Sequence, residues 1–357
     1  MKITILWASL ASYTVAFFRE LVLRNGCQLQ LVYQPPRVNA PYNLFDLSFC
    51  EEALEDTIEN RTSLGDRVNQ FGPDVVLMSS WPYRHFMRLS RKLKKKGAYV
   101  ISTMDNQYRG TLKQRIGIAI APFFLKLSID TFLVAGDRQA EFAKKLGYFD
   151  VMYGLYAAEV DRFITTISIT QRPHSFLFAG RLIDVKNIKG LLEGYAYYRK
   201  KCSAPWDLKI VGTGPLEKVY ARIPGVQMLG FVQPSDLPNM FEKGRCLILP
   251  STFEPWGVVI HEAAAAALSI IATYPCGAVS WFVHDGVNGF VVPPHAEDIG
   301  KAMLRISQKT DDELMMMSRQ SEILAGLWTP AKLAEYFVDS IRWRFRFKEG
   351  IKNQGIG

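Results

Sequence analysis

Two glutamates flank the predicted start of a helix, with a spacing suited to a ligand that carries hydroxyls at both ends. The apolar run 247–249 predicts a buried strand, and the alanine-rich segment after Gly257 favours a helix. Glu254 precedes this helix and Glu262 lies in its second turn. The amides of Gly257 and Val258 mark its positive end, which suits a diphosphate. The pattern fits a nucleotide sugar, although solvated charges on an ordinary strand–loop–helix unit are the alternative.

Two basic residues follow a second predicted strand. Arg181 and Lys186 come after the apolar run 175–179, at the carboxyl end of a strand, where open α/β sheets bind ligands. Arginine offers a planar fork to phosphate oxygens, and lysine offers a compact point charge. The pair would suit a diphosphate leaving group, but taken alone it favours an ordinary solvated loop.

Two further strand ends add weaker signals. Gly212 and Gly214 permit a tight turn or a close backbone approach, yet the third glycine of a dinucleotide fingerprint is missing, so their role is structural. The strand expected at 226–231 leads into Phe231 and Val232, where backbone groups could contact a nucleobase edge. The segment 284–289 has the composition of a tight turn.

Alternating strands and helices predict two α/β domains with parallel sheets. At 357 residues the chain is too long for one typical core. We expect an N-terminal Rossmann-like domain at 1–160 and a second at 161–329, with a linker in 156–173 and a helix in 330–357 packing back on the first. The expected strands are 3–7, 29–33, 75–78, 99–103, 131–135, 175–179, 208–211, 226–231, 246–249, 270–273 and 289–292.

Composition indicates an ordinary globular protein with an anionic partner. The net charge is +9, and five scattered cysteines without a matching histidine spacing predict reduced thiols and no zinc site. No apolar run is long enough to span a bilayer. The N-terminal segment could pass for a signal peptide, but we expect its run 3–7 to be the first strand of the first domain.

The order of five segments resembles the carboxyl-terminal half of GT-B glycosyltransferases of family GT4. These segments are GRLIDVKN, VGTGP, MLGFV, LPSTFEPWGVVIHEAAAAAL and HDGVNGFVVPP, within 175–294. The resemblance implies two facing Rossmann-like domains, a nucleotide-sugar donor held mainly by the second domain, retention of anomeric configuration, no metal and no cofactor. It identifies Glu254 and Glu262 as the two glutamates of the family's E-x7-E motif.

The resemblance also assigns roles to individual residues. Arg181 and Lys186 would neutralise the donor diphosphate, and electrostatic stabilisation of that leaving group would replace a metal. Glu254 would hold hydroxyls of the transferred sugar, and Glu262 would accept from the ribose hydroxyls. The helix-start amides and the strand end near the nucleobase complete the donor-binding set, which consists of Glu262, Gly257, Val258, Phe231 and Val232.

The first domain departs from the family pattern. The first strand lacks the glycine pair of many relatives, and Met104 stands where many have a histidine. Asp105 is then the polar candidate, as a base, as a sugar or acceptor ligand, or simply as a strand-end turn residue. A double displacement would need a carboxylate nucleophile on the far face of the sugar, and none is evident. The resemblance implies front-face attack, with the leaving phosphate taking the acceptor proton.

A basic segment at 84–96 predicts a helix with an apolar stripe of Phe86, Leu89 and Leu93. A solvated helix face is one interpretation, and contact of 84–96 with an anionic membrane surface is the other, aided by the nearby Phe123, Phe124 and Leu125. Nucleic acid is disfavoured because no aromatic-rich binding module accompanies the charge.

We therefore expect a hexosyltransferase-type enzyme that uses a UDP- or GDP-linked sugar. Its acceptor would be a glycan or glycolipid of cell-surface polysaccharide synthesis, and its location cytoplasmic, with peripheral contact to the membrane. The alternatives are a degenerate GT-B protein that binds a nucleotide sugar without turnover, and an NAD-type oxidoreductase or epimerase. The missing G-x-G-x-x-G pattern argues against the last.

Overall fold

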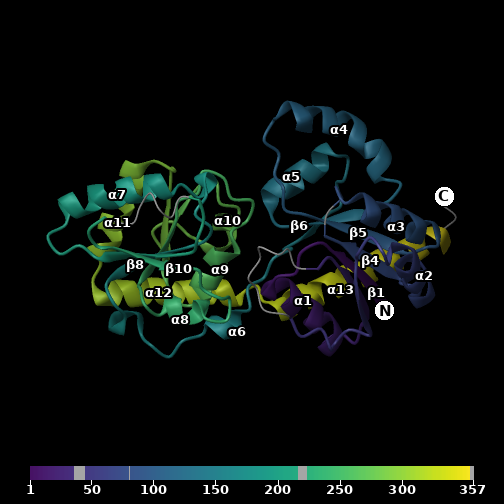
Figure 1. Cartoon of the computed structure of the whole chain (residues 1–357), viewed down its shortest axis with the longest axis horizontal. Coiled ribbons are helices and arrows are strands. Elements are labelled where there is room, and N and C mark those ends of the chain that lie inside the picture. The colour runs from purple at the N-terminus through teal and green to yellow at the C-terminus, as the bar shows by residue number, and fades with distance from the viewer. Residues whose placement is uncertain (36–44, 80, 216–222, 354–357) are drawn as a thin grey trace. The chain divides into compact units, whose positions relative to one another are not determined.

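The chain folds into two α/β units (Figure 1). The computed structural model describes residues 1–35, 45–79, 81–215 and 223–353. Unit 1 consists of Met1–Ala157 with Pro330–Gly357, and unit 2 of Ala158–Thr329. Each unit is built on one parallel sheet covered by helices, so the predicted pair of Rossmann-like sheets is confirmed.

Seven parallel strands form the sheet of unit 1 in the order β3-β2-β1-β4-β5-β6-β7. The sequence predicts five of them because they are continuous apolar runs, buried on both faces. It misses the edge strand β3, in which only two apolar residues lie between two glutamates, and the two-residue strand β7. The bounds are β1 Lys2–Trp7, β2 Gln28–Tyr33, β3 Glu52–Glu55, β4 Val75–Met78, β5 Tyr99–Met104, β6 Thr131–Val134 and β7 Met152–Tyr153.

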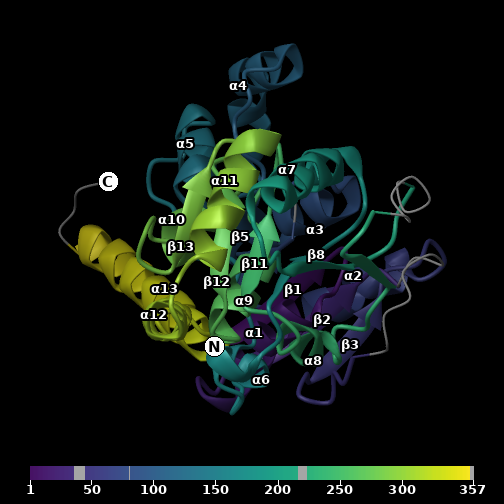
Figure 2. The same cartoon turned by 90° about the vertical axis from the view of Figure 1, so that its left-hand side faces the viewer.

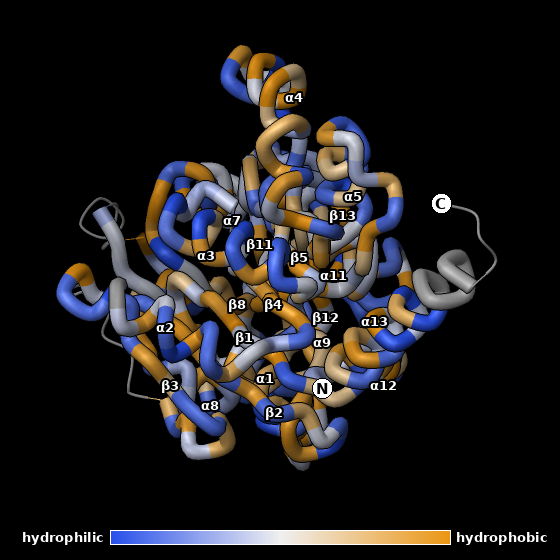
Figure 3. Tube along the Cα trace, turned by 90° about the vertical axis from the view of Figure 1, so that its right-hand side faces the viewer, coloured by the Kyte–Doolittle hydropathy of each residue, from blue (hydrophilic) through white to orange (hydrophobic). Residues whose placement is uncertain are grey.

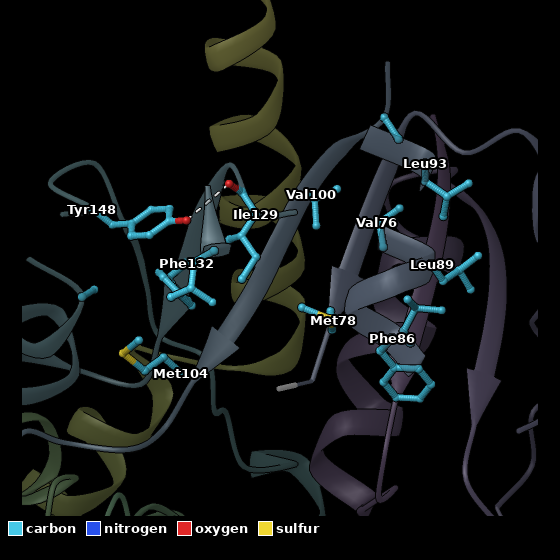
Figure 4. Packing of buried hydrophobic residues seen from close by; sticks show 14 of the residues in the cluster. Val76, Met78, Phe86, Leu89, Leu93, Val100, Met104, Ile129, Phe132 and Tyr148 are labelled. Atoms are coloured by element: carbon cyan, nitrogen blue, oxygen red, sulfur yellow. Dashed lines mark hydrogen bonds between the residues drawn. The ribbon is translucent and has the colours of Figure 1, made fainter. Parts of the chain in front are cut away.

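Helices cover both faces of this sheet. The long helix α13 (Pro330–Asn353) packs on α1 (Ser12–Leu23), where the ring centroids of Phe17 and Phe337 lie 5.6 Å apart. On the second face, side chains of the strands and of four other helices form a core cluster (Figure 4). These helices are α2 Arg61–Phe71, α3 Arg84–Lys95, α4 Leu112–Leu125 and α5 Asp137–Lys145.

The apolar stripe of α3 belongs to this core. Phe86, Leu89 and Leu93 are buried against β4 residues such as Val76 and Met78 (Figure 4). The helix predicted at 84–96 is therefore confirmed, and its apolar stripe packs in the core, while contact of its basic face with an anionic membrane surface stays a prediction. The periodicity identifies an apolar face without saying what covers it.

Six parallel strands form the sheet of unit 2 in the order β10-β9-β8-β11-β12-β13, and all six were predicted. Helices α7 and α11 cover one face, while α9 and α12 pack on the other (Figures 1 and 2). The strands are β8 Ser175–Ala179, β9 Asp207–Val211, β10 Val226–Gly230, β11 Cys246–Leu249, β12 Ser269–Thr273 and β13 Gly289–Val292. The helices are α7 Ile188–Lys201, α8 Leu237–Phe241, α9 Val258–Ala265, α10 Val279–Phe282, α11 Ala296–Ser307 and α12 Asp311–Gly326.

The segment predicted as a linker is mostly part of unit 2. Within 156–173 lie the short helix α6 (Val160–Phe163) and a 3-10 turn, Ile169–Gln171. Phe163 packs on Phe241, and the buried Arg172 donates to the carbonyl of Ala266 at 2.8 Å. The passage between the units, at Ala157 and Ala158, lies within the predicted linker, but most of that stretch belongs to unit 2. Its four-residue helix was missed because it is too short to show periodicity.

Candidate functional site

The ends of two neighbouring strands of unit 2 bring Lys186 and Glu254 together. Lys186 closes a 3-10 turn (Asp184–Lys186) after β8, and Glu254 lies on the loop after β11. Their side chains form an ion pair and are only 16% and 13% exposed. The amide of Thr252 also donates to the carbonyl of Val185 at 2.9 Å, which ties the two loops together. Partial burial strengthens this ion pair relative to one in water.

Asn187 fixes the position of the Lys186 turn. Its backbone is left-handed, with φ of 55°, and its side-chain oxygen caps α7 by accepting from the amide of Gly190 at 3.2 Å. Its side-chain amide donates to the carbonyls of Pro250 and Pro294, each at 3.1 Å. One side chain thus joins the loops that follow β8, β11 and β13. Sequence reasoning quoted Asn187 within a motif but gave it no role.

Arg181 lies on the same loop as Lys186 and is exposed. Among the described residues no carboxylate lies within 4.0 Å of its guanidinium. Its charge therefore remains available to a ligand, whereas that of Lys186 is compensated by Glu254.

Helix α9 begins beside Glu254, as its sequence predicts. Gly257 precedes the helix in the left-handed region, with φ of 91°, and a Cβ there would lie 3.0 Å from Cγ of Glu254. Glycine is therefore needed to bring this carboxylate against the helix start. The amides of Gly257 and Val258 make no hydrogen bond to other described parts of the chain. They keep the partial positive charge of an uncapped helix start.

Glu262 lies in the second turn of α9, beside α6. Burial raises the pKa of Glu262 to about 7, while the charge of Arg162 lowers it and that of Glu159 raises it. Arg162 is itself held by Glu159, at 2.6 Å, and by the carbonyl of Pro234, at 3.0 Å. In the described structure no hydrogen bond reaches the Glu262 carboxylate. Sequence reasoning missed Glu159 and Arg162, whose three-residue spacing was the available signal.

Phe231 and Val232 follow β10 directly. Phe231 is 39% exposed, and the preceding Gly230 accepts a hydrogen bond at its carbonyl from the amide of Gly212 at 2.7 Å. A Cβ on Gly212 would lie 1.9 Å from the carbonyl oxygen of Gly180. The predicted close backbone approach at this glycine is confirmed, and it packs the ends of β8 and β9 together.

In unit 1, Asp105 follows β5 directly. Its carboxylate accepts from the Tyr156 hydroxyl at 3.2 Å, and the Tyr156 ring meets that of Tyr13 edge-on at 5.5 Å. Burial and the neighbouring Asp105 raise the pKa of Tyr156 well above its ordinary value. Met104 is buried in the core cluster (Figure 4), so its side chain takes no place beside Asp105. Both tyrosines escaped sequence reasoning.

Comparison with known proteins agrees with this geometry. Residues 173–309 match the model of the family Glycosyl transferases group 1. Unit 2 therefore carries a glycosyl transferases group 1 domain. The resemblance predicted from its five segments is confirmed over this range.

Curated relatives of the group 1 domain include two glycosyltransferases. One is the alpha-D-kanosaminyltransferase of Streptomyces kanamyceticus, 27% identical over 33% of this chain and 32% of that protein. The other is the GtfA subunit of the UDP-N-acetylglucosamine–peptide N-acetylglucosaminyltransferase of Streptococcus pneumoniae, 26% identical over 48% of this chain and 36% of that protein. The matched part spans about a third of the length of these relatives.

Solved structures extend the likeness in fold to both units. Sucrose-phosphate synthase from Thermosynechococcus elongatus matches with a TM-score of 0.74 and 15% identity, covering 97% of this chain and 99% of that one. Anabaena HepE in complex with UDP-glucose matches with a TM-score of 0.69 and 14% identity, covering 96% and 99%. The predicted GT-B fold is confirmed.

Within the group 1 domain, His261 anchors α9 and hence Glu262. It is fully buried and its ring stacks on Phe282 at 3.9 Å. Nδ1 accepts from the amide of Ala158 at 3.0 Å, so the Nε2 proton donates to the carbonyl of Ala325, also at 3.0 Å. Burial lowers the pKa of His261 to about 4. The ring is therefore a neutral structural bridge, and sequence reasoning did not single it out.

We expect His261→Leu to destabilise the group 1 domain by about 2 to 4 kcal/mol at pH 8, because a buried amide and a buried carbonyl lose their partner. The difference from the wild type should shrink as the pH falls from about 6.5 to about 4, since a histidine with a lowered pKa loses its stabilising contribution there. Guanidinium unfolding at several pH values measures both effects. The exposed His295→Leu is the matched control, and an equal effect there would contradict the assignment.

Proposed function

We propose that the protein is a retaining, metal-independent glycosyltransferase that transfers a sugar from a UDP- or GDP-linked donor to a glycan or lipid-linked acceptor. The observation that carries the proposal is the Lys186–Glu254 pair beside the uncapped start of α9. It places one cation, one carboxylate and a helix N-terminus at the carboxyl ends of adjacent strands, where a sugar diphosphate needs them.

The donor would be held along this edge of the group 1 domain. Its diphosphate would accept hydrogen bonds from Lys186, from Arg181 and from the first amides of α9. As phosphate oxygens bind Lys186, the Glu254 carboxylate becomes available to hydroxyls of the sugar. Glu262 would accept from the ribose hydroxyls, and the backbone at Phe231 and Val232 would border the nucleobase.

The reaction that suits these groups is departure of the diphosphate under electrostatic stabilisation. Negative charge grows on the leaving phosphate, and fixed cations and helix amides stabilise it without reorganising. The acceptor hydroxyl would attack from the side of the leaving group and pass its proton to the departing phosphate oxygen. Asp105, held by Tyr156, would bind a hydroxyl of the acceptor or of the sugar.

The acceptor proposal places the enzyme in synthesis of a cell-surface polysaccharide, at the cytoplasmic face of the membrane. The described helices include none that is long and apolar enough to cross a bilayer. Of the solved relatives, Anabaena HepE was crystallised with UDP-glucose and pneumococcal GtfA with UDP and GlcNAc. These ligands support a sugar nucleotide as the donor of this chain.

Calorimetry with a panel of UDP- and GDP-sugars, in the presence of EDTA, tests the donor proposal. We expect binding of one nucleotide series and transfer with the anomeric configuration of the donor retained, followed by NMR. Binding of NAD with no binding of a sugar nucleotide would overturn the proposal. Donor binding without transfer to any acceptor, including hydrolysis to water, would favour the degenerate binding protein.

A further inference from the structure

Helix α4 of unit 1 exposes a long apolar face. Phe123 and Phe124 are 77% and 62% exposed, and of the residues of this helix only Leu125 is buried. The other exposed large apolar side chains here are Leu112, Ile116, Ile120 and Leu127. Figure 3 shows α4 as a helix with long hydrophobic stretches. Contiguous exposure on this scale marks an interaction site, unlike the single exposed apolar residues found elsewhere on soluble proteins.

The exposed residues share one side of α4, opposite its packed side. Leu112, Ile116, Ile120 and Phe124 recur every four residues, and Phe123 falls within the same stripe. Ile118, Ala121 and Leu125 recur on the other side and pack on the core cluster. One apolar stripe therefore stabilises the fold, and the second has no partner among the described residues.

Positive charge surrounds the second stripe. No acidic residue occurs between Asp105 and Asp130, while α4 and the residue that follows it contribute the exposed Lys113, Arg115 and Lys126. A groove of about 360 Å³ joins α4 to α3, with Phe124 and Leu127 on one side and Arg84, Arg88 and Arg91 on the other. Within the described structure none of these cations has a carboxylate within 4.0 Å.

We propose that the exposed face of α4 binds the surface of an anionic phospholipid bilayer. The apolar stripe enters the boundary between headgroups and acyl chains, and the arginines of the groove bind lipid phosphates. With 14 residues α4 is about 21 Å long, too short to span the bilayer, so it lies in the interface. The proposal rests on the proposed function only in supposing that the acceptor is lipid-linked.

Charge favours a bilayer over the other occupants of such a face. A second copy of the chain would bring two sets of unpaired cations together, which is unfavourable. Nucleic acid would satisfy the cations but leave the aliphatic side chains without an apolar environment. An anionic bilayer satisfies both, because phosphate lies directly above hydrocarbon.

Flotation tests this with vesicles of phosphatidylcholine alone and of phosphatidylcholine with phosphatidylglycerol. We expect the protein to float only with the anionic vesicles, and less so as salt rises. The double variant Phe123→Ser/Phe124→Ser should lower the partition coefficient at least about tenfold. Phe149→Ser, equally exposed in unit 1, should leave it unchanged and is the matched control.

A charge variant tests whether the groove arginines bind lipid phosphates directly or only add to the general attraction between a basic protein and an anionic vesicle. Arg84→Gln/Arg88→Gln/Arg91→Gln should lower the partition coefficient by about fivefold for each charge. Lys144→Gln/Lys200→Gln/Lys201→Gln removes the same charge from exposed positions elsewhere and should have a much smaller effect.

Several results would overturn the proposal. The first is equal flotation with neutral and anionic vesicles, and the second is unchanged flotation of the double phenylalanine variant. The third is a wild-type protein that binds no vesicles and sediments as a dimer, while the double phenylalanine variant sediments as a monomer. Donor affinity is measured on the same proteins in solution. Loss of donor binding with flotation intact would count against the proposed glycosyl transfer alone, and normal donor binding without flotation would count against the bilayer surface alone.

Discussion

Lys186→Met is expected to lower kcat/KM by about a thousandfold or more, the largest effect in the donor site. Lys186 is the partly buried cation closest to where the leaving diphosphate would lie, and methionine keeps the length of its side chain without the charge. The effect should fall mainly on kcat, because the negative charge on the leaving phosphate is greatest in the transition state. Steady-state kinetics with the best donor of the panel measures it.

The ion pair with Glu254 requires a control for stability. Lys186→Met leaves a largely buried carboxylate without its cation, which is destabilising in itself. In Lys186→Met/Glu254→Gln both charges are removed, so stability should recover while activity stays low. Lys189→Met alters an exposed lysine of α7 and should retain full activity. Recovery of activity together with stability in the double variant would show that Lys186 has only a structural role.

Donor binding is expected to release a proton near neutral pH, and Glu262→Gln is expected to abolish that release. The pKa of Glu262 is raised to about 7, so the free protein holds this group about half protonated at pH 7. Ribose hydroxyls that donate to the carboxylate favour its ionised form and lower the pKa. Donor affinity should therefore rise about tenfold from pH 6 to pH 8, since the ionised fraction grows by that factor.

Calorimetry in buffers of different ionisation enthalpy measures the released proton. An intact sugar nucleotide is the proper ligand, because a free nucleoside diphosphate has a terminal phosphate that itself titrates in this range. Glu262→Gln should bind with a flat pH profile, while Glu193→Gln, on the exposed side of α7, should behave as the wild type. Unchanged proton release in Glu262→Gln would remove Glu262 from the ribose site.

The sequence predicts the sheets better than the chemistry that depends on contacts between distant segments. Strands β4, β8, β11 and β13 are predicted to the residue, because each is an uninterrupted apolar run between charged or turn residues. The proximity of Lys186 and Glu254 follows from the same reasoning, since both come directly after strands that share one sheet edge. Both predictions need only local patterns and the rule that ligands bind at the carboxyl ends of parallel strands.

Three features could not be predicted because no local pattern encodes them. The raised pKa of Glu262 depends on burial beside α6, a helix too short for periodicity to reveal. The contact between Asp105 and Tyr156 joins residues that are 51 positions apart. Periodicity identified an apolar face on α3 but not its neighbour, which is the core cluster of unit 1.

The adjacency of His261 and Glu262 has a consequence for the acid response of the group 1 domain. At pH 5.5 the folded chain holds a proton on Glu262 and none on His261, since their pKa values are about 7 and about 4. Unfolding returns both groups to ordinary values, so the carboxyl loses its proton and the imidazole gains one. The two neighbours thus exchange a proton with no net uptake from solvent. Between about pH 4.5 and 6.5 their opposite contributions to the pH dependence of stability cancel, so the stability that the domain loses at His261 on acidification is offset by the stability that it gains at Glu262.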